Sequence, residues 1–131
     1  SYVQGWPITF PESIVSSPVF SDLNSDFNPE IIFSTGGGDL HIINLDGSHY
    51  SNSPFSYAFP YSSSLIINDL DSDGDLEIFS GTADGINIFD IKGQLVFTNK
   101  FAKGKHSINI NTAGFYYLEI NNTNKIPLII N

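Results

Sequence analysis

Four aspartates and a glutamate occupy alternate positions in the stretch DLDSDGDLE, residues 69 to 77. Side-chain oxygens come from loop positions one, three and five, a backbone carbonyl from position seven, and a closing carboxylate from position nine. Oxygen donors at this spacing suit calcium, which takes about 6 to 8 oxygens at about 2.3 to 2.6 Å. Five acids this close repel one another unless a cation compensates. We therefore predict a calcium site with Asp69, Asp71, Asp73, Asp75 and Glu77 as ligands.

A weaker version of this loop lies 47 residues earlier, because VFSDLNSDFNPEIIFST at 19–35 overlays IINDLDSDGDLEIFSGT at 66–82. Phe27 replaces Gly74, which permits the sharp turn of the stronger loop, and Pro29 stiffens the exit. We expect lower calcium affinity here, and a loop kept only for its shape is the alternative. The predicted ligands are Asp22, Asn24, Asp26, Asn28 and Glu30.

The internal similarity extends past the acidic loops. DLHIINLDG overlays GINIFDIKG after a one-residue slip, which places Gly47 on Gly93. Each unit then reads as strand, acidic loop, strand, turn, strand and tight turn. This period is close to the roughly 40 to 50 residues of a β-propeller blade.

The chain as a whole is predicted to be all-β, because short runs rich in Ile, Val, Phe, Tyr and Thr alternate with Gly, Asn, Asp, Ser and Pro clusters. No amphipathic helix is convincing. We expect two propeller-blade-like antiparallel sheets and a C-terminal antiparallel β-sandwich-like unit. The expected strands are Pro18–Ser21, Glu30–Ser34, Leu40–Leu45, Ser64–Asn68, Leu76–Ser80, Ile86–Ile91, Leu95–Asn99, Ser107–Ile110, Phe115–Ile120 and Ile126–Ile130.

Two long runs carry a family resemblance. GWPITFPESIVSSPVFSDLNSDFNPEIIFSTGGGDLHIINLDG and SLIINDLDSDGDLEIFSGTADGINIFDIKG resemble the FG-GAP or VCBS type of repeat found in secreted and surface proteins. The resemblance covers roughly residues 5–93, with repeats at about 5–47 and 52–93. It implies β-propeller blades with a calcium loop between their first two strands, and it is specific for the repeat rather than for one function.

The tail resembles a different family. INIFDIKGQLVFTNKFAKGKHSININTAGFYYLEINNTNKIPLIIN, about residues 86–131, is similar to the end of the C-terminal sorting domain of the type IX secretion system. We accordingly divide the chain into two repeats over 1–93 and a C-terminal β unit over 94–131, with residues 115–120 near the centre of that unit. The alternative is a set of plain antiparallel strands that completes the core.

The charge of the chain argues against nucleic acid and anionic membranes as partners, because 14 acidic residues face 5 lysines and the net charge is −9. No apolar run approaches the roughly 20 residues of a membrane helix. Cysteine is absent, so no disulfide staples the fold. Residues 1–91 hold 13 acids and no base, whereas residues 92–131 hold every lysine and one acid. This asymmetry of −13 against +4 suits head-to-tail contact.

Catalysis finds little support, and we expect no enzyme. His41, His49 and His106 are scattered without metal-binding spacing, so we expect them on strand surfaces or turns. No nucleophile elbow or phosphate loop is present. Sugar binding is an alternative, although most of the aromatic side chains that could stack on a glycan are expected to pack between sheets. These aromatics are Trp6, Tyr50, Tyr57, Tyr61, Tyr116 and Tyr117.

Two repeats are fewer than the three or more that stacked repeats usually need to bury a core, so exposed edges should recruit other strands. We predict a homo-oligomer built by head-to-tail or strand-addition contacts, in which a segment such as Ser1–Phe10 adds to a neighbour's sheet. The predicted function is a secreted, calcium-binding structural block of an extracellular or cell-surface fibre, tube or ring. The alternatives are the C-terminal fragment of a larger secreted adhesin or enzyme, and a carbohydrate-binding module. The first residue is Ser rather than Met, which fits a removed leader or a larger precursor.

Overall fold

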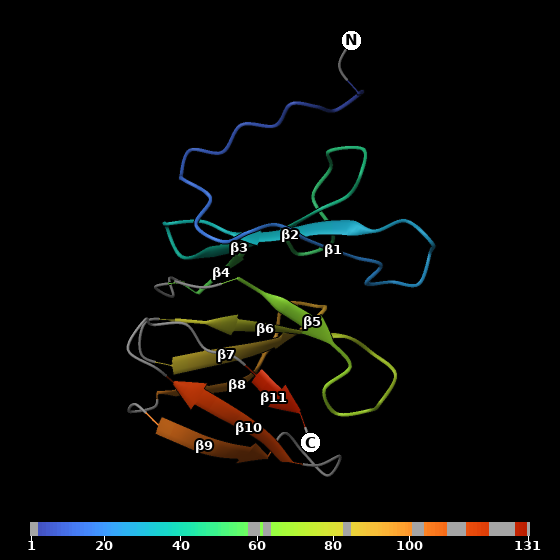
Figure 1. Cartoon of the computed structure of the whole chain (residues 1–131). Coiled ribbons are helices and arrows are strands. Elements are labelled where there is room, and N and C mark those ends of the chain that lie inside the picture. Colours follow the sequence, from blue (N-terminus) through green and yellow to red (C-terminus); the bar gives the residue numbers. More distant parts are fainter. Residues whose placement is uncertain are drawn as a thin grey trace.

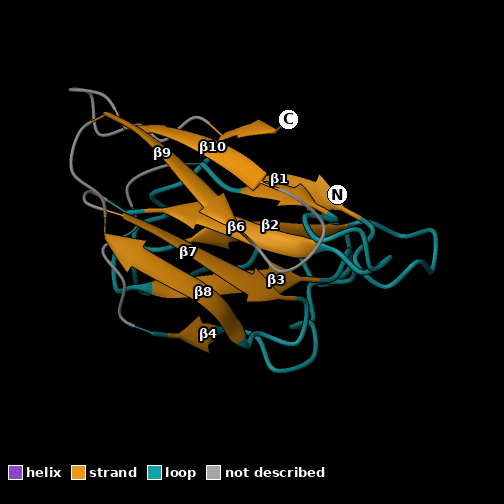
Figure 2. Cartoon of the chain, turned by 90° about the horizontal axis from the view of Figure 1, so that it is seen from below, coloured by secondary structure: helices purple, strands orange, loops and turns teal. Residues whose placement is uncertain are grey.

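The prediction of an all-β chain is confirmed. A computed structural model describes residues 3–57, 61, 64–82, 85–100, 104–109, 115–120 and 128–130, with side chains as far as residue 96. Within these ranges the chain forms three antiparallel sheets and no helix (Figures 1 and 2). The same ranges therefore contain no helix long and apolar enough to span a membrane.

The first sheet is a four-stranded meander in which each strand pairs with the next along the chain. Its strands are β1 (Val19–Ser21), β2 (Glu30–Ser34), β3 (Asp39–Ile43) and β4 (Phe55–Ser56). β2 (EIIFS) and β3 (DLHII) place apolar residues at consecutive positions, and nearly every residue of both strands is buried, as expected for a sheet with two covered faces. Gly38, with φ 90°, takes the left-handed conformation that the tight β2–β3 turn requires.

The second sheet repeats this meander in the same order. Its strands are β5 (Ile66–Asn68), β6 (Glu77–Gly81), β7 (Gly85–Asp90) and β8 (Leu95–Lys100). The β7–β8 turn is held by Asp90, whose Oδ1 accepts hydrogen bonds of 2.9 Å from the backbone N–H groups of both Lys92 and Gln94. The two predicted repeats therefore fold into two sheets of equal topology.

A three-stranded sheet follows, built from β9 (Gly104–Asn109), β10 (Phe115–Ile120) and β11 (Leu128–Ile130). β10 lies between the other two strands and pairs antiparallel with both, which confirms the expected central position of residues 115–120. Of the strands, only the two-residue β4 was not predicted, because its neighbours are serine, asparagine and proline. β3 also ends before the predicted Leu45, since Asn44 already donates its backbone N–H to Ser48 across a turn.

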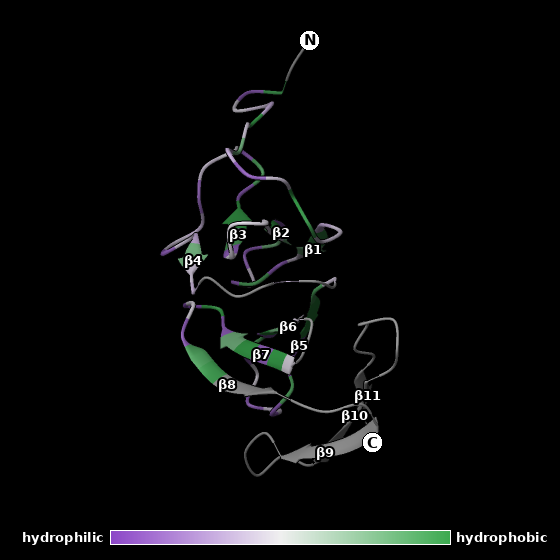
Figure 3. Cartoon of the chain, turned by 90° about the vertical axis from the view of Figure 1, so that its left-hand side faces the viewer, coloured by the Kyte–Doolittle hydropathy of each residue, from purple (hydrophilic) through white to green (hydrophobic). Residues whose placement is uncertain are grey.

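The hydrophobic core lies between the first and second sheets, which are stacked one above the other (Figures 1 and 3). Both sheets contribute large side chains that are buried from solvent. These are Leu23, Ile32, Leu40, Ile42, Phe55, Tyr61, Leu65, Ile78 and Phe89. The core therefore joins the two repeats into one body and fixes the acidic loops at their ends.

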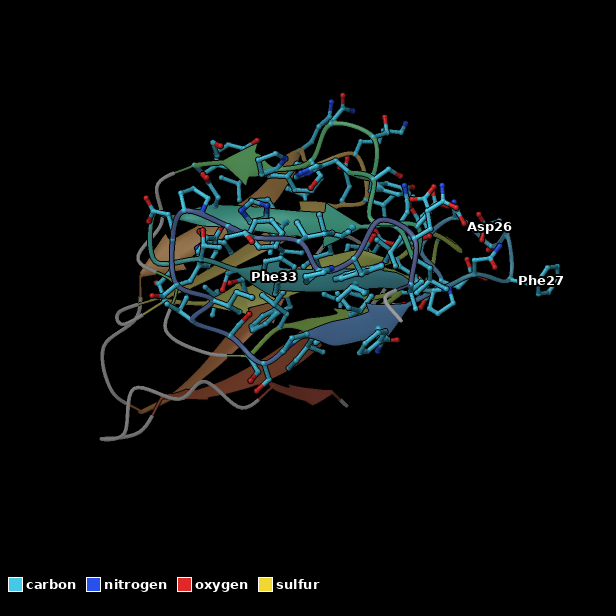
Figure 4. The ribbon with its side chains drawn as sticks, turned by 90° about the horizontal axis from the view of Figure 1, so that it is seen from above. Asp26, Phe27 and Phe33 are labelled. Atoms are coloured by element: carbon cyan, nitrogen blue, oxygen red, sulfur yellow. The ribbon has the colours of Figure 1, made fainter. Side chains whose placement is uncertain are left out.

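The opposite face of the first sheet, here called the outer face, is partly covered by residues 3–17. The Phe10 ring packs edge-on against Phe33 and His41, with centroids 5.0 and 4.9 Å apart (Figure 4). The indole N–H of Trp6 donates to the carbonyl of Leu45 at 2.7 Å. The expectation that His41 lies on a surface or turn is wrong, because Phe33 stacks on its ring and the segment buries it. Addition of residues 1–10 to a neighbour's sheet stays a prediction.

Candidate metal centre

Each acidic loop connects the first two strands of its sheet. The first loop leaves β1 at Ser21 and re-enters the sheet at Glu30, which pairs with Ser21. The second loop leaves β5 at Asn68 and re-enters at Glu77, which pairs with Asn68. A closed pair of strands thus holds both ends of each loop, so the side chains between them must fold over one another.

In the second loop, aspartate side chains bind the loop's own backbone. The two carboxylate oxygens of Asp69 accept hydrogen bonds from the backbone N–H groups of Asp73, at 3.1 Å, and Gly74, at 3.0 Å. Asp71 accepts from the N–H of Asp73 at 3.2 Å, and Asp73 accepts from the N–H of Asp75 at 2.9 Å. These bonds turn the carboxylates inward, toward the centre of the loop.

The first loop has the same hydrogen bonds 47 residues earlier. Asp22 accepts from the N–H groups of Asp26, at 3.0 Å, and Phe27, at 2.9 Å. Asn24 accepts from the N–H of Asp26 at 3.1 Å, and Asp26 accepts from the N–H of Asn28 at 2.8 Å. An asparagine oxygen therefore replaces a carboxylate without changing the path of the backbone.

The left-handed residues also correspond between the loops. Ser25 and Ser72 have φ values of 60° and 61°, and Phe27 has φ 69° where Gly74 has 98°. A bulky residue rarely adopts this conformation, because its Cβ approaches the neighbouring backbone. Phe27 is nevertheless 95% exposed at the tip of the loop (Figure 4). The first loop therefore keeps its turn at the cost of backbone strain.

The closing glutamates are buried beneath the loops, with Glu30 2% and Glu77 5% exposed. Each carboxylate accepts a backbone hydrogen bond, from Leu23 at 2.8 Å and from Leu70 at 2.7 Å. Burial raises the pKa of both glutamates, and the aspartates of the respective loop raise it further. A cation beside these groups would offset both effects, since it favours the charged carboxylate.

In the second loop three carboxylates converge. Asp69, Asp71 and Glu77 each place an oxygen so that the three atoms lie within 4.8 Å of one another. Oxygens on opposite sides of a calcium ion are about 5 Å apart, given bonds of about 2.3 to 2.6 Å, so this spacing fits the ion. Burial raises the pKa of Asp71, and the charges of Asp73 and Asp69 add to the rise. Among the described residues this is the one group of three acidic, histidine or cysteine side chains with such spacing.

The other predicted ligands lie nearby but outside that group. Asp73 and Asp75 belong to the same loop, and Asp75 is exposed at its end. In the first loop Asp22, Asp26 and Glu30 lie around the corresponding position but form no such convergent group. Of the predicted ligands in the two loops, three therefore bring their carboxylates together, namely Asp69, Asp71 and Glu77.

A polar hollow of about 500 Å³ adjoins the first loop. The loop residues in its lining were predicted from the sequence as calcium ligands, whereas the rest of the lining was not predicted. Its lining combines loop residues with Asn44, Asp46 and Tyr50 from the β3–β4 connection. In the second repeat Lys92 and Val96 stand at the positions of Asp46 and Tyr50. This difference between the two repeats is the feature of the sequence that could have indicated the additional lining residues.

Comparison with known protein families gives one finding. A family model described as a secretion system C-terminal sorting domain matches residues 60–130, which is 71 of the 131 residues. The match begins ahead of β5, so it takes in the second acidic loop as well as the tail. No curated protein matches the chain.

Proposed function

Because the chain belongs to the family of secretion system C-terminal sorting domains, we propose that it is a calcium-stabilised, non-catalytic β-repeat protein exported by the type IX system. The family makes it a secreted protein that resides outside the cell or on its surface. In the proposal, the tail directs export and the two repeats, of FG-GAP or VCBS type, form the folded body. Calcium occupies the second acidic loop and, more weakly, the first.

The calcium part of the proposal is carried by the three carboxylate oxygens of Asp69, Asp71 and Glu77 within 4.8 Å. The first loop reaches the same backbone geometry with fewer acids, so the extra carboxylates of the second loop are not needed to shape it. Their mutual repulsion is an avoidable cost unless a cation binds. Ligands that are all oxygen favour calcium over zinc, which prefers nitrogen and sulfur.

The role of structural block rests on the shared core, to which both sheets contribute buried side chains. The family match favours a second candidate, in which this chain is the C-terminal part of a larger secreted adhesin or enzyme. In that case the repeats link the sorting tail to an active region. The mass of the mature secreted protein distinguishes the two candidates.

Calcium titration with calorimetry and thermal unfolding tests the metal site. We expect heat of binding and a higher Tm in millimolar calcium, and in Asp71→Asn we expect calcium affinity to fall about tenfold with a smaller rise in Tm. Glu12→Gln, which removes one charge outside the loops, is the matched control and should bind as the parent does. Equal binding by both variants, or no binding by the parent, would overturn the calcium proposal and leave the export role untouched.

A further inference from the structure

The outer face of the first sheet carries exposed apolar side chains beside the segment of residues 3–17. Phe20 is 62% and Leu45 44% exposed. Val3, Trp6, Ile31 and Leu45 line an almost wholly apolar hollow of about 450 Å³. An exposed apolar surface of this kind is an interaction site more often than other parts of a protein surface are.

The second sheet shows what covers the equivalent face. Its residues Ile67, Ile78 and Ile91, at the positions of Phe20, Ile31 and Leu45, pack into the core against the first sheet. The strand registers agree, because Ile78 pairs with Phe89 as Ile31 pairs with Ile43. The outer face of the first sheet is thus the same surface that, in the second sheet, is buried beneath a neighbouring sheet.

The segment of residues 3–17 also has an equivalent, namely residues 50–64, which contain β4. Gly5 and Asn52, 47 residues apart, both have positive φ, of 86° and 64°. Ile14 bridges to Thr35 as Tyr61 bridges to Thr82, again 47 residues later. Trp6 donates to the turn after β3, and Tyr57 donates its hydroxyl to the carbonyl of Gly93 in the turn after β7. The described residues of the two segments therefore lie alike on their sheets.

This equivalence predicts a strand pairing. Phe55 and Ser56, which form β4, pair with Leu40 and Asp39 of β3. Ile8 and Thr9 stand at the positions of Phe55 and Ser56, yet no strand of the described chain pairs with them. By this equivalence, residues 8 and 9 are positioned to form the fourth strand of a further sheet. The described part of this chain does not contain that sheet.

We propose that the outer face and residues 3–10 form a docking site for a β-sheet of the same repeat type. That sheet presents an apolar inner face like the one formed by Ile32, Leu40 and Ile42, and its third strand pairs with Ile8 and Thr9. The contact continues the packing by which the first sheet lies on the second. It does not depend on calcium or on the export role.

An intact second copy of this chain does not fit the site. In each copy the inner face of the first sheet is buried against the second sheet, and the edge of β3 is already paired with β4. Neither the face nor the edge is free to bind another molecule. The occupant is therefore a further repeat that lacks its own fourth strand, so that residues 8 and 9 complete it.

The proposal can be tested with a tandem variant. In this variant a second copy of residues 4–50 is inserted directly ahead of Gln4 of the full chain. The copy supplies a sheet whose fourth strand would be the original residues 8 and 9. We expect their amide exchange to slow by about tenfold or more relative to the parent chain. The matched control carries Ile32→Asp in the added copy, which cannot form a packed sheet and should leave the exchange fast.

Leu45→Ser in the original repeat gives an independent measurement. It should lower the Tm of the tandem chain by about 4 °C and leave that of the parent nearly unchanged. Phe27→Ser, at an exposed loop tip, should have the same effect in both chains. Unchanged exchange at residues 8 and 9, equal effects of Leu45→Ser, or a tandem chain that fails to fold would each overturn the proposal. A parent dimer abolished by Leu45→Ser would also overturn it, because a second copy would then be the occupant.

Discussion

The two repeats share one loop geometry but differ in charge. The hydrogen bonds that Asp22 and Asp69 accept from equivalent backbone N–H groups differ by only 0.1 Å in length, at 3.0 and 3.1 Å and at 2.9 and 3.0 Å. Both loops bury a closing glutamate, yet the first contains three acids and the second five. Side-chain oxygens of either type therefore shape the loop, whereas the additional carboxylates only add negative charge to it.

The repeats also differ on their outer faces. The second sheet packs the equivalent of the outer face against the first sheet, whereas residues 3–17 alone among the described residues lie on the outer face of the first sheet. Equivalent positions are consequently buried in one repeat and exposed in the other. The environment of a side chain in this chain depends on the neighbouring sheet as much as on its own strand.

Removal of a closing glutamate should have the largest effect on this comparison. In chelator we expect Glu30→Ala and Glu77→Ala to cost about 2 kcal/mol each, because the N–H of Leu23 or Leu70 loses its buried acceptor. In calcium Glu77→Ala should lower the free energy of unfolding more than Glu30→Ala does. Denaturant unfolding of both variants, with and without calcium, measures these costs. Glu77→Gln, which keeps an acceptor oxygen, is the control, and a cost equal to that of Ala in chelator would contradict the hydrogen-bond explanation.

Substitution of the ligand at loop position three should narrow the difference in calcium affinity between the two loops. Asn24→Asp adds a carboxylate to the first loop and should raise its calcium affinity about tenfold, which is about 1.4 kcal/mol. The backbone should not change, since Asn24 already accepts the same hydrogen bond as Asp71. Calorimetry detects the gain as a stronger second binding event. A change in the unfolding free energy without calcium would instead show that the substitution altered the loop itself.

Substitutions at the left-handed position, residue 27 in the first loop and residue 74 in the second, should have opposite effects on stability. Phe27→Gly should stabilise the chain and Gly74→Ala should destabilise it, each by about 1 kcal/mol, because only glycine adopts this conformation without strain. A Cβ at Gly74 would meet no other atom within 4 Å, so its cost is purely conformational. Thermal unfolding in chelator measures both variants. Effects of the same sign would refute the claim that the loops share this strain.

The smallest expected effect is a pH dependence of stability that comes from His41, which is buried on the outer face of the first sheet. Burial lowers the pKa of His41, His49 lowers it further, and Asp39 partly opposes this. The unfolded chain then binds a proton before the native one, so stability should fall as the pH drops from about 6.5 toward the native pKa. His41→Asn, which introduces the residue found at the equivalent position 87, should remove this slope. A slope that persists in the variant would assign it to other groups.

Sequence reasoning predicted the parts of this fold that repeat. The 47-residue offset located both loops, since position-specific oxygen donors leave a clear pattern, and the assignment of those donors as calcium ligands stays a prediction. It did not locate β4, because two residues beside Pro54 carry no strand pattern and pair only through tertiary contact with β3. The burial of His41 was missed for a similar reason. It depends on Phe10, which lies 31 residues away in the chain.

The pairing of β6 with β7 bears on the use of this chain as an export tag. A tag that begins at residue 86 would retain β7 but lose β6, with which residues 86–90 pair along their whole length. The buried Ile86 and Ile88 would then face solvent on an unpaired edge, which favours aggregation of the fused cargo. The family match begins at residue 60, ahead of β5. A fusion joined before that residue keeps β5 to β8 together in the tag, so that β7 remains paired with β6.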